Sequence, residues 1–152
     1  MKTYMEQAIE EAQKGILSGE GGPFGSVIVK DGKVIGRGHN QVVKNNDPTC
    51  HGEIMAIRDA CKNLQTFDLS GAVLYTTAYP CPMCLGAILW ANIDAVYYGC
   101  TVEDTEKIGF RDSDFYKKIE NGHITQFVHE LSREECLRLY EEYQKLPDKK
   151  NY

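Results

Sequence analysis

Four residues of types that bind metals or carry protons occur in two short motifs. His51 and Glu53 form an H-G-E sequence, and Cys81 and Cys84 form a C-x-x-C. A catalytic Zn²⁺ takes three protein ligands, often Cys thiolates and neutral His, and keeps an open position for water. His51, Cys81 and Cys84 can supply those ligands, and the metal would lower the pKa of the bound water toward ~7. Glu53, two residues beyond a ligand, can take a proton from that water and return it to a leaving group.

The sequence around the two motifs indicates how they meet. An apolar helical pattern begins at His51, and a second covers 82–92 with a proline in its first turn. Positions 54 to 79 place 26 residues between Glu53 and Pro80, which is room for one helix, a turn and one strand. The motifs therefore occupy equivalent points of adjacent strand–helix units, at the sheet edge where open α/β folds bind ligands. Helix N-termini there also favour the thiolate form of cysteine.

The remaining pattern predicts one sheet flanked by helices. Apolar spacing predicts a helix over 4–18, and Asp31-Gly32 suits a type I′ turn between strands at 24–30 and 33–40. We expect an antiparallel hairpin there and parallel crossovers later. The further expected elements are helices at 51–64 and 113–119, strands at 72–77 and 94–99, a final strand within 124–131, and a last helix that opens with a Ser132–Glu135 capping box.

Length and composition limit the class of protein. The 152 residues are room for one domain, and 42% hydrophobic with 26% charged residues is an ordinary globular mixture. No apolar stretch approaches the ~20 residues that span a bilayer, and no secretory signal is present. Six cysteines without such a signal favour a cytoplasmic protein that needs no disulfides. The net charge of −5, with no basic cluster, argues against broad electrostatic binding to nucleic acid.

Together, H-x-E and P-C-x-x-C form the signature of zinc deaminases, and the chain resembles the cytidine deaminase-like superfamily. Within it, the chain is similar to the bacterial guanine deaminases along nearly its whole length. The resemblance implies an α/β, three-layer α-β-α fold with a mixed sheet of about five strands. It also implies one Zn²⁺ per subunit and hydrolysis of guanine to xanthine and ammonia in purine metabolism. The matching stretches are GGPFGSVIVKDGKVI, NDPTCHGE, AIR-AC, PCPMCLGAILWA, GF-RDS-FY and the terminal KKNY.

The resemblance also assigns substrate contacts and an assembly. The substrate would be a small nucleobase, with neither membrane nor nucleic acid as partner. The chain would be a single deaminase domain, 1–152, in a homodimer that can exchange the segment from about 131 to 152 between its copies. The implied contacts are Phe24 packing on the purine ring, Asn40 hydrogen-bonding the base, Trp90 lining the pocket, Asp112 contacting the base, and Tyr152 closing the site.

Two positions depart from the family pattern. Gly52 stands where Ala is usual, and Tyr79 stands where related deaminases commonly have Glu. The missing carboxylate leaves two other substrates open, namely tRNA adenosine and cytosine or another heterocycle. An alternative of another class is a zinc-stabilised binding module without catalysis, which would not need Glu53.

Simpler interpretations exist for several of these residues. The C-x-x-C alone could be a redox pair, and Cys50 could be the fourth ligand of a purely structural zinc. Phe24 could be core, Trp90 could be helix packing, and Asn40 could cap the loop after its strand. Asp112 could cap a helix and Tyr152 could be disordered. We expect Cys61, Cys100 and Cys136 to be buried small apolar side chains, and His39, His123 and His129 to be surface or hairpin residues.

Overall fold

Four strands form a mixed sheet in the order β2-β1-β3-β4. β1 (Gly25–Lys30) pairs antiparallel with β2 (Lys33–His39) on one side and with β3 (Val73–Ala78) on the other. β4 (Ala95–Cys100) pairs parallel with β3. The computed structural model describes all 152 residues, and the sheet belongs to the first of two compact units, 1–116 and 117–152.

The turn between β1 and β2 has the predicted form. Asp31 and Gly32 have φ angles of 50° and 75°. A type I′ turn needs positive φ at both central residues, and it matches the right-handed twist of the flanking strands. The predicted N-terminal antiparallel hairpin is therefore confirmed.

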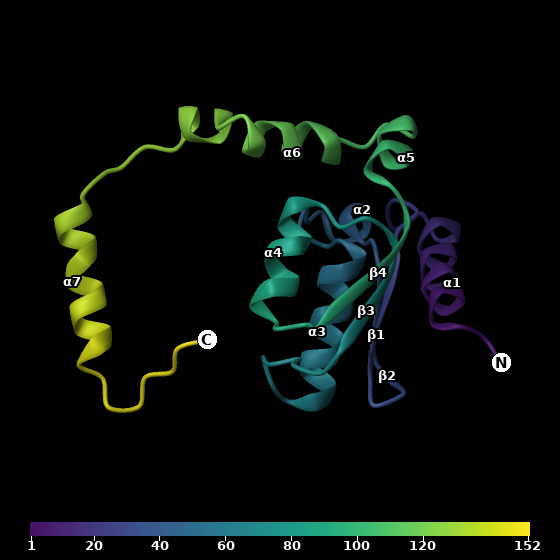
Figure 1. Cartoon of the computed structure of the whole chain (residues 1–152), viewed down its shortest axis with the longest axis horizontal. Helices are drawn as coiled ribbons and strands as arrows, with labels where there is room; N and C mark the ends of the chain where they lie inside the picture. Colours follow the sequence, from purple (N-terminus) through teal and green to yellow (C-terminus); the bar gives the residue numbers. More distant parts are fainter. The chain divides into compact units, whose positions relative to one another are not determined.

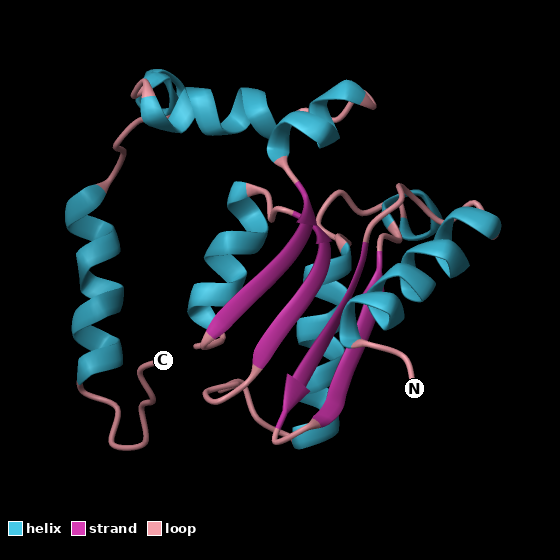
Figure 2. Cartoon of the chain, turned by 45° about the vertical axis from the view of Figure 1, so that its right-hand side comes forward, coloured by secondary structure: helices cyan, strands magenta, loops and turns pink.

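Helices cover both faces of the sheet. α1 (Tyr4–Leu17) packs against β1, β2 and β3, and α3 (Gly52–Leu64) packs against β2 and β1. α4 (Pro82–Trp90) joins β3 to β4 and packs against α3. Figures 1 and 2 show α1 on one face of the sheet and α3 with α4 on the other. The three-layer α-β-α prediction is confirmed.

The side chains of β1 divide the core into two halves. Val27 and Val29 pack with Ala8 of α1, whereas Ile28 packs with Ala56 of α3. This alternation follows from the two-residue period of a strand. Ser26 shares the face of Ile28, so its side chain lies on the side of α3.

Glycine in β2 lets α3 approach the sheet closely. A Cβ atom on Gly38 would lie 2.4 Å from the backbone nitrogen of Ala56 and 2.6 Å from the carbonyl oxygen of Gly52. Any larger residue would push the first turn of α3 away from the sheet. This contact therefore sets the position of the helix start that carries His51 and Glu53.

Three short helices lie outside these layers, one between β2 and α3 and two after β4. α6 (Asp112–Glu120) agrees with the helix predicted near 113–119. α2 (Val42–Asn45) and α5 (Val102–Lys107) were not predicted. The start of α5 did have a sequence signal, because Thr101 and Asp104 form a capping box.

The unit 117–152 contains no strand, so the prediction of about five strands is wrong. Residues within the expected strand 124–131 instead form the short 3₁₀ helix η1 (His123–Phe127), and no backbone ladder pairs them with another segment. The apolar residues of this segment, Ile124, Phe127, Val128 and Leu131, have the spacing of a helix face and not the alternation of a strand. A strand also needs a neighbour that accepts its backbone hydrogen bonds. The last helix, α7 (Arg133–Gln144), is present, but Ser132 has a left-handed φ of 56° and does not cap it. The predicted capping box is therefore also wrong.

Three single cysteines, Cys61, Cys100 and Cys136, are less buried than expected. Cys61 is half-buried, and Cys100 and Cys136 are exposed, so the prediction that all three are core residues is wrong. Cys100 ends an edge strand, and no residue of α7 is buried. In the whole chain, no helix combines the length and apolar character needed to cross a membrane.

Candidate active site

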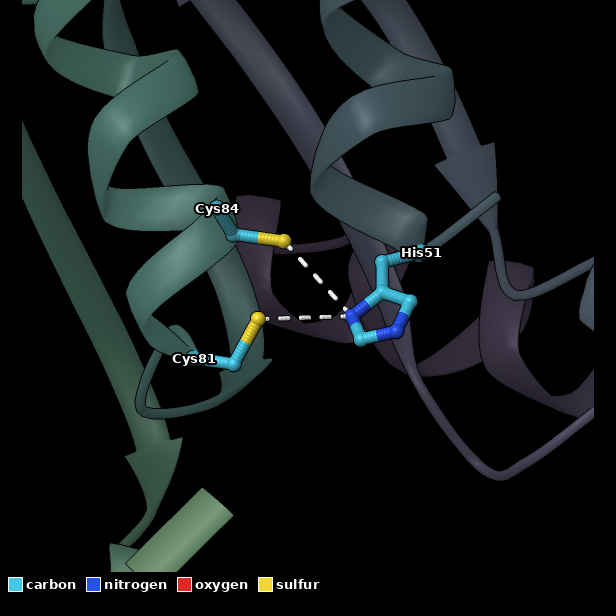
Figure 3. A group of neighbouring side chains, drawn as sticks. All are labelled: His51, Cys81 and Cys84. Carbon is cyan, nitrogen blue, oxygen red and sulfur yellow. Dashed lines mark hydrogen bonds between the residues drawn. The ribbon is translucent and has the colours of Figure 1, made fainter. Parts of the chain in front are cut away.

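The two motifs lie at the starts of two neighbouring helices. His51 is the N-cap residue of α3, and Cys81 is the N-cap residue of α4. Neither side chain makes a capping hydrogen bond, so both are available for other contacts. Both helices follow strands that end at the same edge of the sheet, as predicted. Figure 3 shows the two sulfurs, from the first turn of α4, pointing toward the imidazole at the start of α3.

The three side chains converge with the geometry of a metal centre. His51 Nδ1 lies 3.5 Å from Cys81 Sγ and 3.7 Å from Cys84 Sγ. The three ligand atoms all lie within 4.8 Å of one another. Bonds of about 2.3 Å to sulfur and about 2.0–2.1 Å to nitrogen at tetrahedral angles would separate such atoms by about 3.5–3.8 Å. The donor set and its spacing therefore fit one tetrahedral Zn²⁺.

The charges at this centre favour a bound cation. The pKa of Cys81 is lowered to about 4, mainly because the Cys84 thiol donates a hydrogen bond to its sulfur, with His51 as a further cause. The same hydrogen bond, together with burial, raises the pKa of Cys84. The pKa of His51 is raised, first through its contact with Cys81. A cation among these atoms would favour both thiolates and neutral imidazole at once.

The chain offers three ligands at this centre and no fourth. Cys50 is 2% exposed and is not part of the ligand group. Its sulfur lies 3.6 Å from Asn45 Nδ2 and 3.9 Å from an Arg58 guanidinium nitrogen. The interpretation of a structural zinc with Cys50 as fourth ligand therefore finds no support. An arrangement with three protein ligands is typical of catalytic zinc.

Glu53 lies in the first turn of α3, close to the metal-ligand group. Its side chain is buried, with the residue 6% exposed, and burial is the main reason why its pKa is raised. The hydroxyl of Ser26 lies 3.4 Å from its Oε1. Glu53 also lines the same cavity as His51 and Cys81.

That cavity has a volume of about 600 Å³ and a mainly apolar lining. Pockets for small ligands commonly have about 300–1,000 Å³ and few polar groups. Phe24 lies in its wall and packs edge-on against Phe110, with 4.9 Å between ring centroids. Tyr79, which replaces the Glu of related deaminases, also lines it. The structure thus combines a metal-ligand group, a buried carboxyl and an aromatic wall in one cavity.

Asn40 and Asp112 are polar residues of the cavity wall. Asn40 is 5% exposed, and its Oδ1 accepts a hydrogen bond of 3.0 Å from the backbone N–H of Val42. It therefore orders the loop after β2 and lines the cavity at the same time. Asp112 is the first residue of α6, and its pKa is raised by burial and by the nearby Cys81.

The other two predicted substrate contacts lie elsewhere in the chain. Trp90 ends α4, is 66% exposed and does not line this cavity. Tyr152 belongs to the unit 117–152 and is 79% exposed. The substrate roles of both residues stay predictions.

Tyr116 is a residue of this region that sequence reasoning missed. Its hydroxyl donates a hydrogen bond to the carbonyl of Pro80, the residue before Cys81, and burial raises its pKa. Tyr116 thereby joins α6, which carries Asp112, to the segment just before α4, the helix that begins at the two cysteines. The only signal was its position in the family stretch GF-RDS-FY, which does not indicate what the hydroxyl binds.

His39 is a hairpin residue, as predicted, because it ends β2 and pairs with Gly25 of β1. Its side chain is 15% exposed and bridges two carboxylates, Glu11 at 3.1 Å and Glu20 at 2.9 Å. Glu20 also binds Lys44 at 3.0 Å and Gln41 at 3.1 Å. The cluster ties α1 to the loop and the short helix that form one wall of the cavity.

Comparisons with known proteins agree with this geometry. The profile of the family described as "Cytidine and deoxycytidylate deaminase zinc-binding region" matches residues 1–100. The chain belongs to this family. The matched region contains both motifs, so the chain is a zinc-binding deaminase, and the redox and non-catalytic alternatives are not supported.

Individual relatives of this deaminase are similar over much of its length. It is 42% identical to the guanine deaminase of Bacillus subtilis, over 99% of this chain and 98% of that one. The crystal structure of the B. subtilis guanine deaminase matches it with a TM-score of 0.92, covering 100% of this chain and 99% of the other. A tRNA-specific adenosine deaminase of Haemophilus influenzae is 38% identical over 87% of this chain and 76% of its own.

Proposed function

We propose that the chain is a zinc-dependent guanine deaminase that converts guanine and water to xanthine and ammonia. The observation that carries this proposal is the convergence of His51, Cys81 and Cys84 beside Glu53 in one cavity. The choice of guanine rests on the similarity to the B. subtilis enzyme, which extends through the C-terminal segment of this chain.

His51, Cys81 and Cys84 would hold the metal, and Glu53 would carry protons. Zinc bound there would lower the pKa of a water and stabilise negative charge that develops at the reacting carbon. Glu53 accepts a proton from the water as its oxygen bonds to C2 of guanine, and the carboxyl delivers that proton to a ring nitrogen. The second proton of the same water leaves the new hydroxyl group on C2 and passes through the Glu53 carboxyl to the 2-amino group. The C–N bond then breaks, ammonia leaves, and C2 becomes the carbonyl of xanthine.

Other side chains would hold the base in place. Phe24 offers an apolar ring for the purine face, and Asn40 offers amide groups for its edge. Asp112 would accept hydrogen bonds from ring N–H groups, and the mainly apolar lining would limit water near the reacting carbon. Trp90 and Tyr152 would complete the site in the assembled enzyme.

We further propose a cytoplasmic homodimer in which the segment from about 131 to 152 is exchanged between copies. Support comes from each unit by itself. The unit 117–152 buries none of its α7 residues and exposes large apolar side chains, among them Leu131 at 84% and Tyr140 at 70%. The unit 1–116 exposes Leu89 and Trp90 of α4. Apolar surface of this extent is typical of subunit contacts.

A tRNA adenosine deaminase is the second candidate, favoured by the similarity to the H. influenzae protein. The net charge of −5 argues against it, because binding to an RNA backbone relies on basic side chains. Ammonia release should be measured with guanine, adenine, cytosine, cytidine and an anticodon-loop RNA. We expect turnover of guanine, and turnover of the RNA alone would overturn the proposal.

Glu53→Gln tests the proposed proton carrier. The amide has nearly the same shape but cannot accept and return a proton, so kcat should fall by about 10²–10⁴-fold. Zinc content by mass spectrometry and the melting temperature should stay at wild-type values. A Glu53→Gln protein with full activity would show that another group carries the protons.

A further inference from the structure

Two hydroxyl groups lie in the core beneath the start of α3. Ser26 of β1 and Thr76 of β3 are paired in register across the antiparallel ladder, and they are 0% and 1% exposed. Their neighbours on the same face of these strands, Ile28 and Leu74, are core residues. Two polar groups in such a place are costly to bury unless they are hydrogen-bonded, so their partners are informative.

The hydroxyls form a chain that ends at Glu53. Ser26 Oγ lies 2.9 Å from Thr76 Oγ1 and 3.4 Å from Glu53 Oε1. Each hydroxyl has one hydrogen to donate and can also accept. When Thr76 donates to Ser26 and Ser26 donates to the carboxylate, both hydrogens are used. The order can also reverse, so the contact persists whether or not the carboxyl carries a proton.

We propose that Ser26, supported by Thr76, is a positioning residue for Glu53. A glutamate side chain has several rotatable bonds, and the start of α3 fixes only its backbone. The hydroxyl chain holds one carboxyl oxygen against the sheet and leaves the other for the cavity, beside the metal ligands. Reactions lose rate steeply when a reacting group is displaced, so this anchoring would affect kcat more than substrate binding. This inference rests on the proposed role of Glu53.

Two substitutions of Thr76 separate positioning from packing. Thr76→Val keeps the volume and removes the hydroxyl, whereas Thr76→Ser keeps the hydroxyl and removes a methyl group. We expect Thr76→Val and Ser26→Ala to lower kcat by about tenfold to a hundredfold with unchanged KM and zinc content. Thr76→Ser should retain the wild-type kcat even where its melting temperature is lower.

Thr77→Val is the matched control on the same strand. The Thr77 hydroxyl binds the backbone N–H of Gly25 and not Glu53, so its loss should lower stability and leave kcat unchanged. In a Glu53→Gln background, Ser26→Ala should cause no further loss of activity, because there is no working carboxyl to position.

The outcomes for Ser26 and for the substrate are distinguishable. If the wild-type enzyme deaminates a base other than guanine, the guanine assignment fails. The role of Ser26 is then decided by the kcat of Ser26→Ala and of the Thr76 variants, relative to wild type, on that base. Wild-type kcat in both Ser26→Ala and Thr76→Val would overturn the inference, as would equal losses in Thr76→Ser and Thr76→Val. Deamination of no base by the wild-type protein would overturn both.

Discussion

Replacement of Tyr116 by phenylalanine removes one hydrogen bond and leaves the ring in place. The Tyr116 hydroxyl donates to the carbonyl of Pro80, a fully buried residue just before Cys81. A buried acceptor that loses its donor lowers the free energy of unfolding by about 1–3 kcal/mol. For proteins of this length, each kcal/mol lost lowers the melting temperature by about 2–4 °C. Tyr116→Phe should therefore lower the melting temperature by about 2–12 °C.

The same substitution should lower activity. The hydrogen bond ties α6, whose residue Asp112 lines the cavity, to the segment just before α4. Looser attachment should reduce kcat/KM for guanine by about tenfold, equivalent to about 1.4 kcal/mol of transition-state stabilisation. Differential scanning calorimetry and steady-state ammonia release measure the two effects.

Tyr98→Phe is the control for Tyr116→Phe. Tyr98 packs edge-on against the Tyr79 ring, as Tyr116 does, but it is 46% exposed and lies on β4. The Tyr98→Phe protein should have the melting temperature and the kcat/KM of the wild type. Wild-type values for both quantities in Tyr116→Phe would refute the reasoning that this hydroxyl holds the site together.

The remaining predictions concern the metal, the pH dependence and the C-terminal segment. Cys84→Ala should lose stoichiometric zinc, because two ligands hold the metal far less tightly than three. Mass spectrometry measures the zinc content, and full occupancy in this variant would disprove the ligand set. The pKa of Glu20 is lowered from 4.5 to about 2, first by its hydrogen bond to Lys44. The ionised carboxylate therefore contributes its full stabilisation above pH 4.5, and this contribution is lost as the pH falls through about 2. The melting-temperature difference between wild type and Glu20→Gln should therefore shrink over that range, and a constant difference would contradict this. Deletion of 147–152 should keep fold and zinc but cut guanine turnover at least about tenfold, and full turnover would show a tail without a role. In a mixed dimer of this deletion protein with Glu53→Gln, the intact Glu53 site can receive the segment 147–152 only from the other copy. Mixing should therefore restore activity if the segment acts in the partner's site, and no restoration would show that it acts in the site of its own subunit.

Much of the site was predictable because its determinants are local. Ligand types depend on side-chain chemistry, and the apolar helical patterns that begin at His51 and Pro82 place both motifs at helix starts. Because the intervening chain has room for one helix and one strand, the two starts had to meet at one edge of the sheet. The Asp31-Gly32 turn was equally readable, since few residue pairs favour positive φ at both positions.

Features that depend on contacts between distant segments required the tertiary structure. A strand was expected within 124–131, but a strand needs a neighbour, and the sheet of the first unit ends at β4. His39 had no partner at ligand spacing in the sequence, yet it lies between Glu11 and Glu20 because α1 packs across the hairpin. Ser26 and Thr76 are 50 residues apart and resemble ordinary strand residues. Only the pairing of β1 with β3 brings their hydroxyls together beneath Glu53, because strand register is set by the packing of the whole sheet.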